Sequence, residues 1–266
     1  MPFVLYVLFT KQKLADILYL NAPTTKNVLF AILLGITFVP IIVLSSILVP
    51  MITAAIFPNT GFDAAAIAGA APTLGILILA GAVFPAIFEE ILFRGAFFNQ
   101  YFGHKNGVSI WKTAFVTALF FGLIHGNIIQ LLYAIPFGLV FAFSLYYTRS
   151  IWIPVITHFV ANALSFMLAS AQPPQINGYY EVMQYANDYT ATGGMNPVIA
   201  MLAVFGGLSV VMLPLMILCM RKFKKYYTKT QSTEEVTTTQ KVYTWEFWIV
   251  VAIWVVFSIV SGLGVI

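Results

Sequence analysis

The sequence predicts an all-α fold, a polytopic bundle of transmembrane helices that forms a single domain over residues 1–266. Hydrophobic residues make up 61% of the chain and charged residues only 8%, whereas about a quarter of the residues in a soluble domain are charged. Several apolar runs exceed the roughly 18 residues that cross a bilayer. The basic residues are also distributed asymmetrically between the connecting segments. Together these observations exclude a soluble protein.

Apolar runs separated by turn signals predict about seven helical spans. The runs cover residues 28–52, 74–98, 111–125, 127–147, 151–171, 197–220 and 245–265. The third is short and its junction with the fourth, at residues 125–127, is tight, so these two are expected to form a helical hairpin with its turn near or inside the membrane. Residues 1–20 lack the basic first region and the cleavage site of a signal peptide. They are expected to form an interfacial or partly buried tail, or an eighth span if they insert.

The connecting segments predict the orientation. If the segment before the first span is cytoplasmic, every lysine and arginine except Arg94 falls on the cytoplasmic side, and the outer loops contain no basic residue. This places the C-terminus outside and makes residues 221–244 a basic cytoplasmic linker. The outer loop 171–196 could fold over the bundle or could be a solvated connector.

Several functional classes are excluded or disfavoured. The net charge of +4 follows the membrane topology, so it does not indicate a nucleic-acid partner. The chain has one cysteine, Cys219, which excludes an intrachain disulfide and a cysteine-based metal site. There is no internal repeat, which disfavours an inverted-repeat transporter.

The second span carries three ionisable residues, Glu89, Glu90 and Arg94, between apolar residues. Each such charge costs about 2.5 to 3.5 kcal/mol at the centre of a membrane helix, so intramembrane ionisable residues are functional candidates. On a helix Glu90 and Arg94 share one face, whereas Glu89 is turned about 100° away. We therefore expect Arg94 to pair with Glu90 and to leave Glu89 available. The alternative is a purely structural ion pair near the cytoplasmic end.

A proline precedes the two glutamates. Pro85 has no backbone N–H, and the carbonyl that this N–H would reach in an α-helix belongs to Gly81. We therefore expect a local kink in the turn that leads to Glu89.

Two histidines lie in other spans. His125 shares a helix face with Phe121, and Gly122 permits close approach of a neighbouring helix. In the fifth span His158 and Asn162 are again four residues apart, as side chains of a metal site or an oxyanion pocket could be. The third histidine, His104, lies in a polar loop and is expected to be solvated. Carboxylates, imidazoles and an amide are together the groups that activate water against a carbonyl.

These motifs resemble a known family. Phe88 to Gly95 resembles the EExxxR motif of the CAAX prenyl protease and bacteriocin-processing family, also called the abortive-infection family. Phe121 to His125 matches its FxxxH motif, and His158 to Asn162 matches its HxxxN motif, preceded by a similar segment at residues 150–154. The three motifs are intact and in order, and the resemblance covers about residues 74–170.

The resemblance implies an intramembrane endopeptidase with an all-helical bundle and a cavity open toward the cytoplasm. It implies that Glu89 is the general base that activates water and that His125 positions this water. Glu90 with Arg94 would be structural support. His158 and Asn162 would line the site and stabilise the oxyanion.

Two mechanisms remain open within this resemblance. Members are commonly described as metalloproteases, in which case the ligands of a divalent ion such as zinc would be Glu89, His125 and His158. A metal-free mechanism driven by a glutamate is also proposed for the family. A carboxylate in an apolar span tends to be neutral unless a cation, a metal or solvent keeps it ionised, so either mechanism requires a hydrated cavity.

The expected partners are membrane lipid and a peptide or protein substrate that is lipidated or membrane-inserted, with no nucleic acid. Eukaryotic-type members remove the last three residues of prenylated CAAX proteins, whereas bacterial members are associated with peptide maturation and self-immunity. The chain length without large insertions favours a prokaryotic cell membrane. The alternatives are a catalytically silent scaffold or regulator of membrane proteins, and a proton-coupled transporter.

Overall fold

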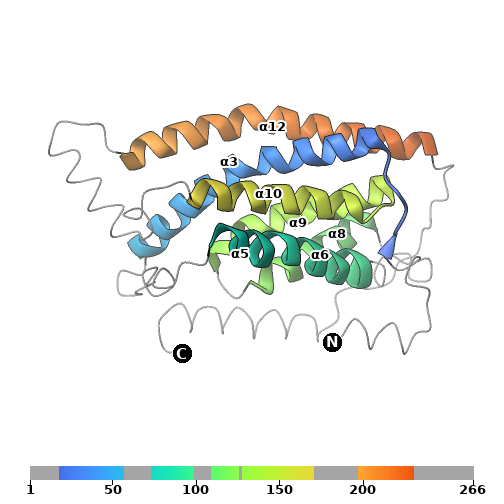
Figure 1. Ribbon diagram of the computed structural model, residues 1–266, viewed down its shortest axis with the longest axis horizontal. Coiled ribbons are helices and arrows are strands. Elements are labelled where there is room, and N and C mark those ends of the chain that lie inside the picture. Colours follow the sequence, from blue (N-terminus) through green and yellow to red (C-terminus); the bar gives the residue numbers. More distant parts are fainter. Residues whose placement is uncertain (1–17, 57–72, 99–108, 126–127, 171–196, 231–266) are drawn as a thin grey trace.

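The computed structural model describes residues 18–56, 73–98, 109–125, 128–170 and 197–230, and these ranges form a bundle of helices (Figure 1). Its helices, in chain order, are α3 (Thr25–Ile56), α5 (Leu74–Ile78), the π-helix η1 (Leu79–Val83), α6 (Phe84–Glu90), the π-helix η2 (Ile91–Phe97), α8 (Ile110–Leu123), α9 (Ile128–Thr148), α10 (Trp152–Ser170) and α12 (Pro197–Thr230). The predicted all-α class is confirmed, and the first six predicted spans each coincide with helical structure. The seventh, 245–265, lies outside the described residues.

Three of these helical stretches are long and apolar enough to cross a membrane: Thr25–Ser45, Leu74–Phe97 and Ile199–Tyr227. The others are shorter apolar helices, namely Ile110–Leu123, Tyr133–Thr148 and Trp152–Leu168. The second long stretch is helical without interruption, although its backbone alternates between α-helical and π-helical turns. These lengths and compositions fit an integral membrane protein.

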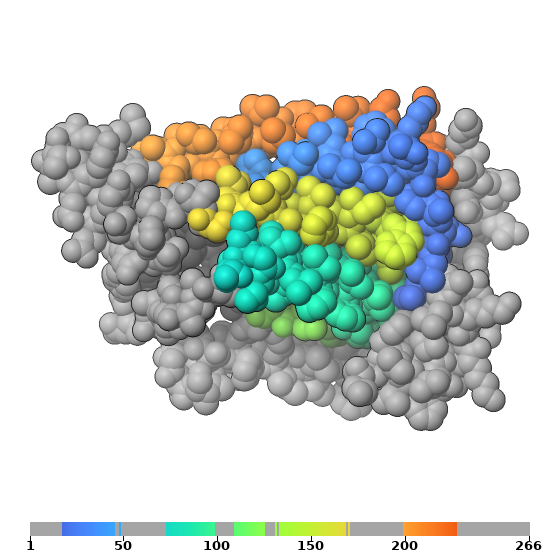
Figure 2. All heavy atoms as spheres, in the orientation of Figure 1, coloured from blue at the N-terminus to red at the C-terminus, as the bar shows by residue number. Residues whose placement is uncertain are grey.

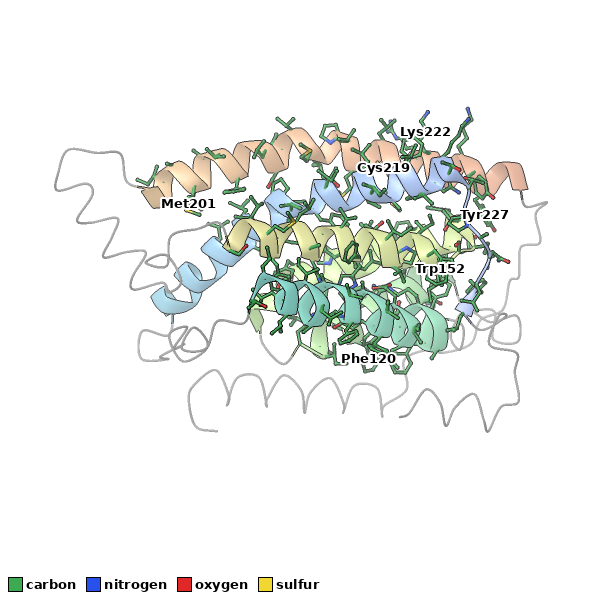
Figure 3. All side chains as sticks on the ribbon, in the orientation of Figure 1. Phe120, Trp152, Met201, Cys219, Lys222 and Tyr227 are labelled. Carbon is green, nitrogen blue, oxygen red and sulfur yellow. The ribbon has the colours of Figure 1, made fainter. Side chains whose placement is uncertain are left out.

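The basic residues collect at one end of the bundle, which we call the basic end. Helices α3, α8 and α10 begin there, and α9 and α12 end there. Figure 3 labels Lys222, Trp152 and Tyr227 near this end and Met201 near the other. Apart from Arg94, the basic residues of the described ranges lie at or near this end: Lys26, Lys112, Arg149, Arg221, Lys222, Lys224, Lys225 and Lys229. The structure thus has the one-sided charge that the sequence predicts, and the side of the membrane that it faces stays a prediction.

Helix α12 is longer than predicted. It continues to Thr230, so the first ten residues of the expected linker 221–244 are helical, and residues 231–244 lie outside the described range. Phe223 is fully buried and meets the ring of Phe30 edge-on, with centroids 6.5 Å apart. Four residues later, the Tyr227 hydroxyl accepts a hydrogen bond from the Tyr146 hydroxyl at 3.1 Å. These two anchors on one face extend the helix past its basic turn.

Helix α10 lies between α3 and the second span, as Figures 1 and 2 show. A Cβ atom on Gly35 of α3 would lie only 2.7 Å from Val160 Cβ and 2.8 Å from the Thr157 carbonyl oxygen, so only glycine permits this approach. The Thr157 hydroxyl also donates to the Ala31 carbonyl at 3.1 Å. Both contacts fix α10 immediately beside His158.

Helices α8 and α9 form the predicted antiparallel pair. A Cβ on Gly138 would lie 2.9 Å from the Ala118 Cα, and a Cβ on Gly122 would lie 2.8 Å from Leu131 Cδ1. The predicted close approach at Gly122 is therefore present. Two residues of the connecting turn, 126–127, lie outside the described ranges.

A short strap precedes α3 and joins the turn between α9 and α10. Leu20 and Ser150 form an isolated antiparallel bridge, and the Ser150 hydroxyl donates to the Asn21 carbonyl at 2.6 Å. Tyr19 and Arg149 both have positive φ, at 50° and 53°. Residues 18–21 of the chain are thus pinned to the turn that begins α10, whereas residues 1–17 lie outside the described part.

Candidate active site

The second span approaches the site through an irregular turn. The Phe84 N–H bonds to the Leu79 carbonyl, five residues back, and Pro85 follows with no N–H to donate. The backbone directly before Phe84 and Pro85 is thus π-helical, and the kink expected in this turn stays a prediction. A second π-helical turn, η2, begins directly after Glu90 and contains Arg94. The two glutamates therefore lie on a short α-helical piece between two widened turns.

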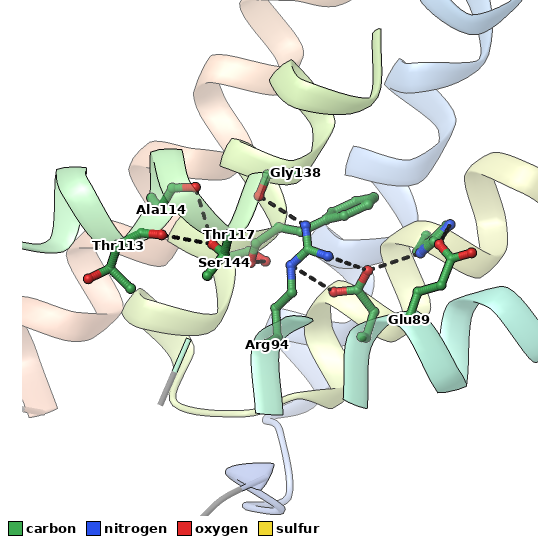
Figure 4. Close-up of polar contacts among 10 residues, drawn as sticks. Glu89, Arg94, Thr113, Ala114, Thr117, Gly138 and Ser144 are labelled. Carbon is green, nitrogen blue, oxygen red and sulfur yellow. Dashed lines mark hydrogen bonds and ion pairs between the residues drawn. The ribbon is translucent and has the colours of Figure 1, made fainter. Parts of the chain in front are cut away.

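Glu90 and Arg94 form the predicted ion pair, and both side chains are fully buried. Arg94 Nη1 donates to Glu90 Oε1 at 3.1 Å, and Arg94 Nε lies 3.1 Å from Glu90 Oε2 without forming a directed hydrogen bond. Arg94 Nη2 donates to the Gly138 carbonyl of α9 at 3.0 Å (Figure 4). The pair thus ties the second span to the α8–α9 hairpin.

Aromatic rings surround the buried guanidinium. Arg94 Cζ lies 4.5 Å from the ring centroid of Phe121 and 5.1 Å from that of Phe141. Cations are attracted to the faces of such rings, and the attraction strengthens when water is excluded. The two rings therefore partly replace the water that Arg94 loses on burial.

His158 lies on the other side of Glu90. Its Nδ1 is 3.0 Å from Glu90 Oε1, and its ring stacks on Phe141 with centroids 5.1 Å apart. Because the carboxylate of a buried ion pair can only accept, Nδ1 carries a proton. The His158 Nε2 lies 3.9 Å from Glu89 Oε2. Glu90 therefore orients His158 as well as pairing with Arg94, a link that the sequence analysis did not predict.

Glu89 has a different environment from its neighbour. A quarter of its side chain is exposed, whereas the side chain of Glu90 has no exposed surface. Its Oε2 is buried and accepts no hydrogen bond from any described residue. Glu89 also interacts electrostatically with both His158 and His125. The expectation that Glu89 stays available while Arg94 holds Glu90 matches this geometry.

His125 approaches from the end of α8. Its Nδ1 lies 2.8 Å from the Phe121 carbonyl, so Nδ1 carries the proton and Nε2 is the basic nitrogen. The Phe121 ring lies edge-on to both imidazoles, 5.2 Å from His125 and 5.8 Å from His158. The Phe121 ring thus packs against both histidines.

Asn162 is on the same face of α10 as His158, as predicted. Its Nδ2 donates to the Gly81 carbonyl at 3.1 Å, across 81 residues of sequence. The amide therefore contacts the backbone of the second span. His104 lies outside the described residues.

The family comparison bears on these motifs directly. The family described as type II CAAX prenyl endopeptidase Rce1-like matches residues 71–164, a stretch that contains all three motifs. Residues 71–164 are thus similar to this family, and we call them the Rce1-like segment. The Rce1-like segment thus holds every candidate site residue named above.

A curated relative agrees with this result. Over 87 residues the chain is 28% identical to "Putative membrane peptidase YdiL" of Bacillus subtilis (strain 168). The match covers 33% of this chain and 34% of that relative, so the chain spans about a third of the length of the relative that it matches. No solved structure matches the chain.

The described part of the Rce1-like segment does not present a preformed metal site. Among the described residues, no group of three or more His, Cys, Asp or Glu side chains lies close enough together to hold a metal ion. The orphaned Glu89 Oε2 suits a ligand, but Glu89, His125 and His158 do not form a three-ligand set in this arrangement. The zinc expectation stays a prediction, and no chemical step is derived from it.

Sequence reasoning missed two residues at the centre of the Rce1-like segment. Gly138 supplies the carbonyl that binds Arg94, and Phe141 lies against both Arg94 and His158. Both are on α9, which carries none of the three motifs. Gly138 and Phe141 are three residues apart and therefore share one face of the helix. An apolar helix contains many pairs with this spacing, so the spacing alone does not identify these two residues.

Proposed function

We propose that this protein is an intramembrane endopeptidase in which Glu89 activates a water molecule for attack on a peptide carbonyl. The observation that carries the proposal is the contrast between the two adjacent glutamates. Glu90 is fully buried, and Arg94 and His158 lie 3.0 to 3.1 Å from its two oxygens, whereas Glu89 is partly exposed and its Oε2 lies 3.9 Å from His158 Nε2 without a hydrogen bond from a described residue. A general base must keep such an oxygen for its substrate proton.

The proposed reaction is ordinary peptide hydrolysis. Glu89 takes one proton from water while the water oxygen bonds to the carbonyl carbon. The tetrahedral intermediate then expels the amine, to which Glu89 returns the proton, and the second water proton stays on the new carboxylic acid. No other reactant is required.

The two histidines have distinct proposed roles. His125 holds its proton on Nδ1, so its Nε2 can accept a hydrogen bond from the attacking water and orient it. Glu90 accepts the Nδ1 proton of His158 and so fixes the ring with Nε2 near Glu89. A protonated His158 donates from Nε2 to the oxyanion that develops on the substrate.

The proposed substrate is a membrane-associated or lipidated peptide. The site lies within apolar helices, and the surrounding surface carries large exposed apolar side chains such as Phe88 and Phe84. A freely soluble peptide would have to enter this apolar region, whereas a lipidated or membrane-inserted one is already there. We place the protein in a prokaryotic cell membrane with its basic end in the cytoplasm, following the positive-inside rule.

The experiment uses purified full-length protein in lipid nanodiscs and a panel of fluorogenic peptides, with and without a prenyl chain. We expect Glu89→Gln and His125→Ala to abolish cleavage while leaving helix content and folded yield unchanged. Undiminished cleavage by either folded variant would refute the assignment. If the wild-type protein folds and cleaves no peptide of the panel, the scaffold alternative is favoured.

The same preparation tests metal dependence. Metal content is measured by mass spectrometry, and cleavage is measured before and after treatment with a chelator. Cleavage that persists in metal-free protein supports the glutamate-driven mechanism. Loss on chelation with recovery on adding zinc supports the predicted ligand set instead.

A further inference from the structure

The Gly81 carbonyl has lost its regular helical partner. In an α-helix this oxygen would accept the N–H of residue 85, but residue 85 is proline. The preceding N–H, of Phe84, bonds to Leu79 instead. Because unpaired backbone carbonyls are costly away from water, a membrane helix must satisfy this oxygen from elsewhere.

Asn162 supplies the missing donor. Its side-chain Nδ2 donates to the Gly81 carbonyl at 3.1 Å, and it does so from α10. One helical turn further along α10, Phe166 covers the same glycine. A Cβ on Gly81 would lie 2.5 Å from Phe166 Cε2 and 2.6 Å from Phe166 Cζ. Asn162 and Phe166, on one face of α10, therefore both contact Gly81 of the second span.

The two contacting faces continue to the proposed catalytic groups. On α10, His158, Asn162 and Phe166 follow each other at intervals of four residues, and on the second span Gly81 is eight residues before Glu89. At one end of this contact Asn162 and Phe166 hold Gly81, and at the other His158 Nε2 lies 3.9 Å from Glu89 Oε2. The turn between them contains the π-helical segment and Pro85.

We propose that Asn162 is a positioning residue, which holds the proline turn of the second span against α10 and so sets the place of Glu89 relative to His158. The proposal rests on the proposed function for its effect on catalysis. It differs from the role implied by the family resemblance, in which this amide stabilises the oxyanion. The amide has two N–H groups, and the hydrogen bond that the structure shows for it goes to the protein backbone, at the Gly81 carbonyl.

A double-mutant cycle separates the two roles, because Pro85→Ala returns a backbone N–H to the turn. We expect Asn162→Ala to lower kcat on the order of tenfold with little change in KM, since displaced catalytic groups slow the chemical step. In the Pro85→Ala background the same substitution should lower kcat by only about twofold, because the new N–H supplies the donor that the carbonyl needs. Loss of an oxyanion donor would instead cost about a hundredfold or more in kcat in both backgrounds.

Thermal unfolding of the same four proteins in detergent gives a readout that does not depend on activity. Asn162→Ala should lower the apparent Tm by a few degrees, and Pro85→Ala should remove most of that decrease. Ser165→Ala is the matched control on α10, because the Ser165 hydroxyl only donates to the Ala161 carbonyl of its own helix at 2.8 Å. It should change neither Tm nor kcat.

Equal effects of Asn162→Ala on Tm and on kcat in both backgrounds would overturn the proposal. If Pro85→Ala is not recovered as folded protein, Gly81→Ala replaces it, since its Cβ displaces Phe166 from the same contact. Gly81→Ala and Asn162→Ala should then be less than additive in Tm, and full additivity would overturn the proposal. If the wild-type protein cleaves nothing, the proposed function fails, but the thermal cycle still decides whether Asn162 holds the turn.

Discussion

Replacing Arg94 by methionine should strongly destabilise the protein. Methionine keeps the apolar stem but removes the charge, the hydrogen bond to Glu90 Oε1 at 3.1 Å and the hydrogen bond to the Gly138 carbonyl at 3.0 Å. Glu90 then keeps one described partner, His158 Nδ1 at 3.0 Å, although its side chain has no exposed surface.

The structure sets the size of this effect. Removing one member of a buried ion pair costs about 3 to 5 kcal/mol, because the other charge is left buried without compensation. Most of that cost belongs to the stranded carboxylate of Glu90 rather than to lost attraction. Glu90→Gln in the same chain removes the stranded charge and keeps an oxygen that can accept from His158. The double variant Glu90→Gln/Arg94→Met should therefore recover about half of the loss or more.

The assay is a denaturation titration of the purified protein in mixed micelles, with the free energy of unfolding read from tryptophan fluorescence. Glu89→Gln is the matched control, because Glu89 is adjacent in sequence but partly exposed and not part of the pair. It should change the unfolding free energy by less than about 1 kcal/mol. Wild-type stability of Arg94→Met, or a double variant less stable than Arg94→Met alone, would refute the reasoning.

Two further predictions concern packing outside the site. Gly35→Ala should destabilise the protein by about 1 to 3 kcal/mol in the same titration, because its Cβ would lie 2.7 Å from Val160 Cβ. The control Gly206→Ala, whose Cβ would meet nothing within 4 Å, should be neutral or slightly stabilising. Equal effects of the two substitutions would contradict this reasoning. Ser150→Ala should cost about 1 kcal/mol by releasing the strap at the Asn21 carbonyl, and the control Ser209→Ala, whose hydroxyl bonds only within its own helix, should not.

The parts of the site that could be predicted from sequence are those fixed by spacing on one helix. The pair of Glu90 with Arg94 and the shared faces of His125 with Phe121 and of His158 with Asn162 follow from a separation of four residues. The role of Pro85 could also be anticipated, because the missing N–H is a property of the residue itself.

Contacts between helices could not be predicted in the same way. The bond from Arg94 to the Gly138 carbonyl spans 44 residues, and the bond from Asn162 to Gly81 spans 81. Each bond depends on the register of two packed helices. Every residue has a backbone carbonyl, so the residue type does not indicate which carbonyl accepts a hydrogen bond from another helix. Helix α12 illustrates the reverse error: its Lys- and Thr-rich end resembles a linker, but Phe223 and Tyr227 anchor it to the bundle.

The arrangement of the two glutamates also links stability to the proposed chemistry. Arg94 balances the charge of Glu90, which leaves Glu89 as the carboxylate that can act as a base. Without Arg94 the negative charge of Glu90 would have no guanidinium beside it and would repel the charge of the adjacent Glu89. Arg94→Met should therefore reduce cleavage per folded molecule, and Glu90→Gln/Arg94→Met should restore part of it, because the neutral amide no longer opposes ionisation of Glu89. Cleavage rates normalised to folded protein would test this, and a double variant that remains as inactive as Arg94→Met would mean that Arg94 has a more direct part in the reaction.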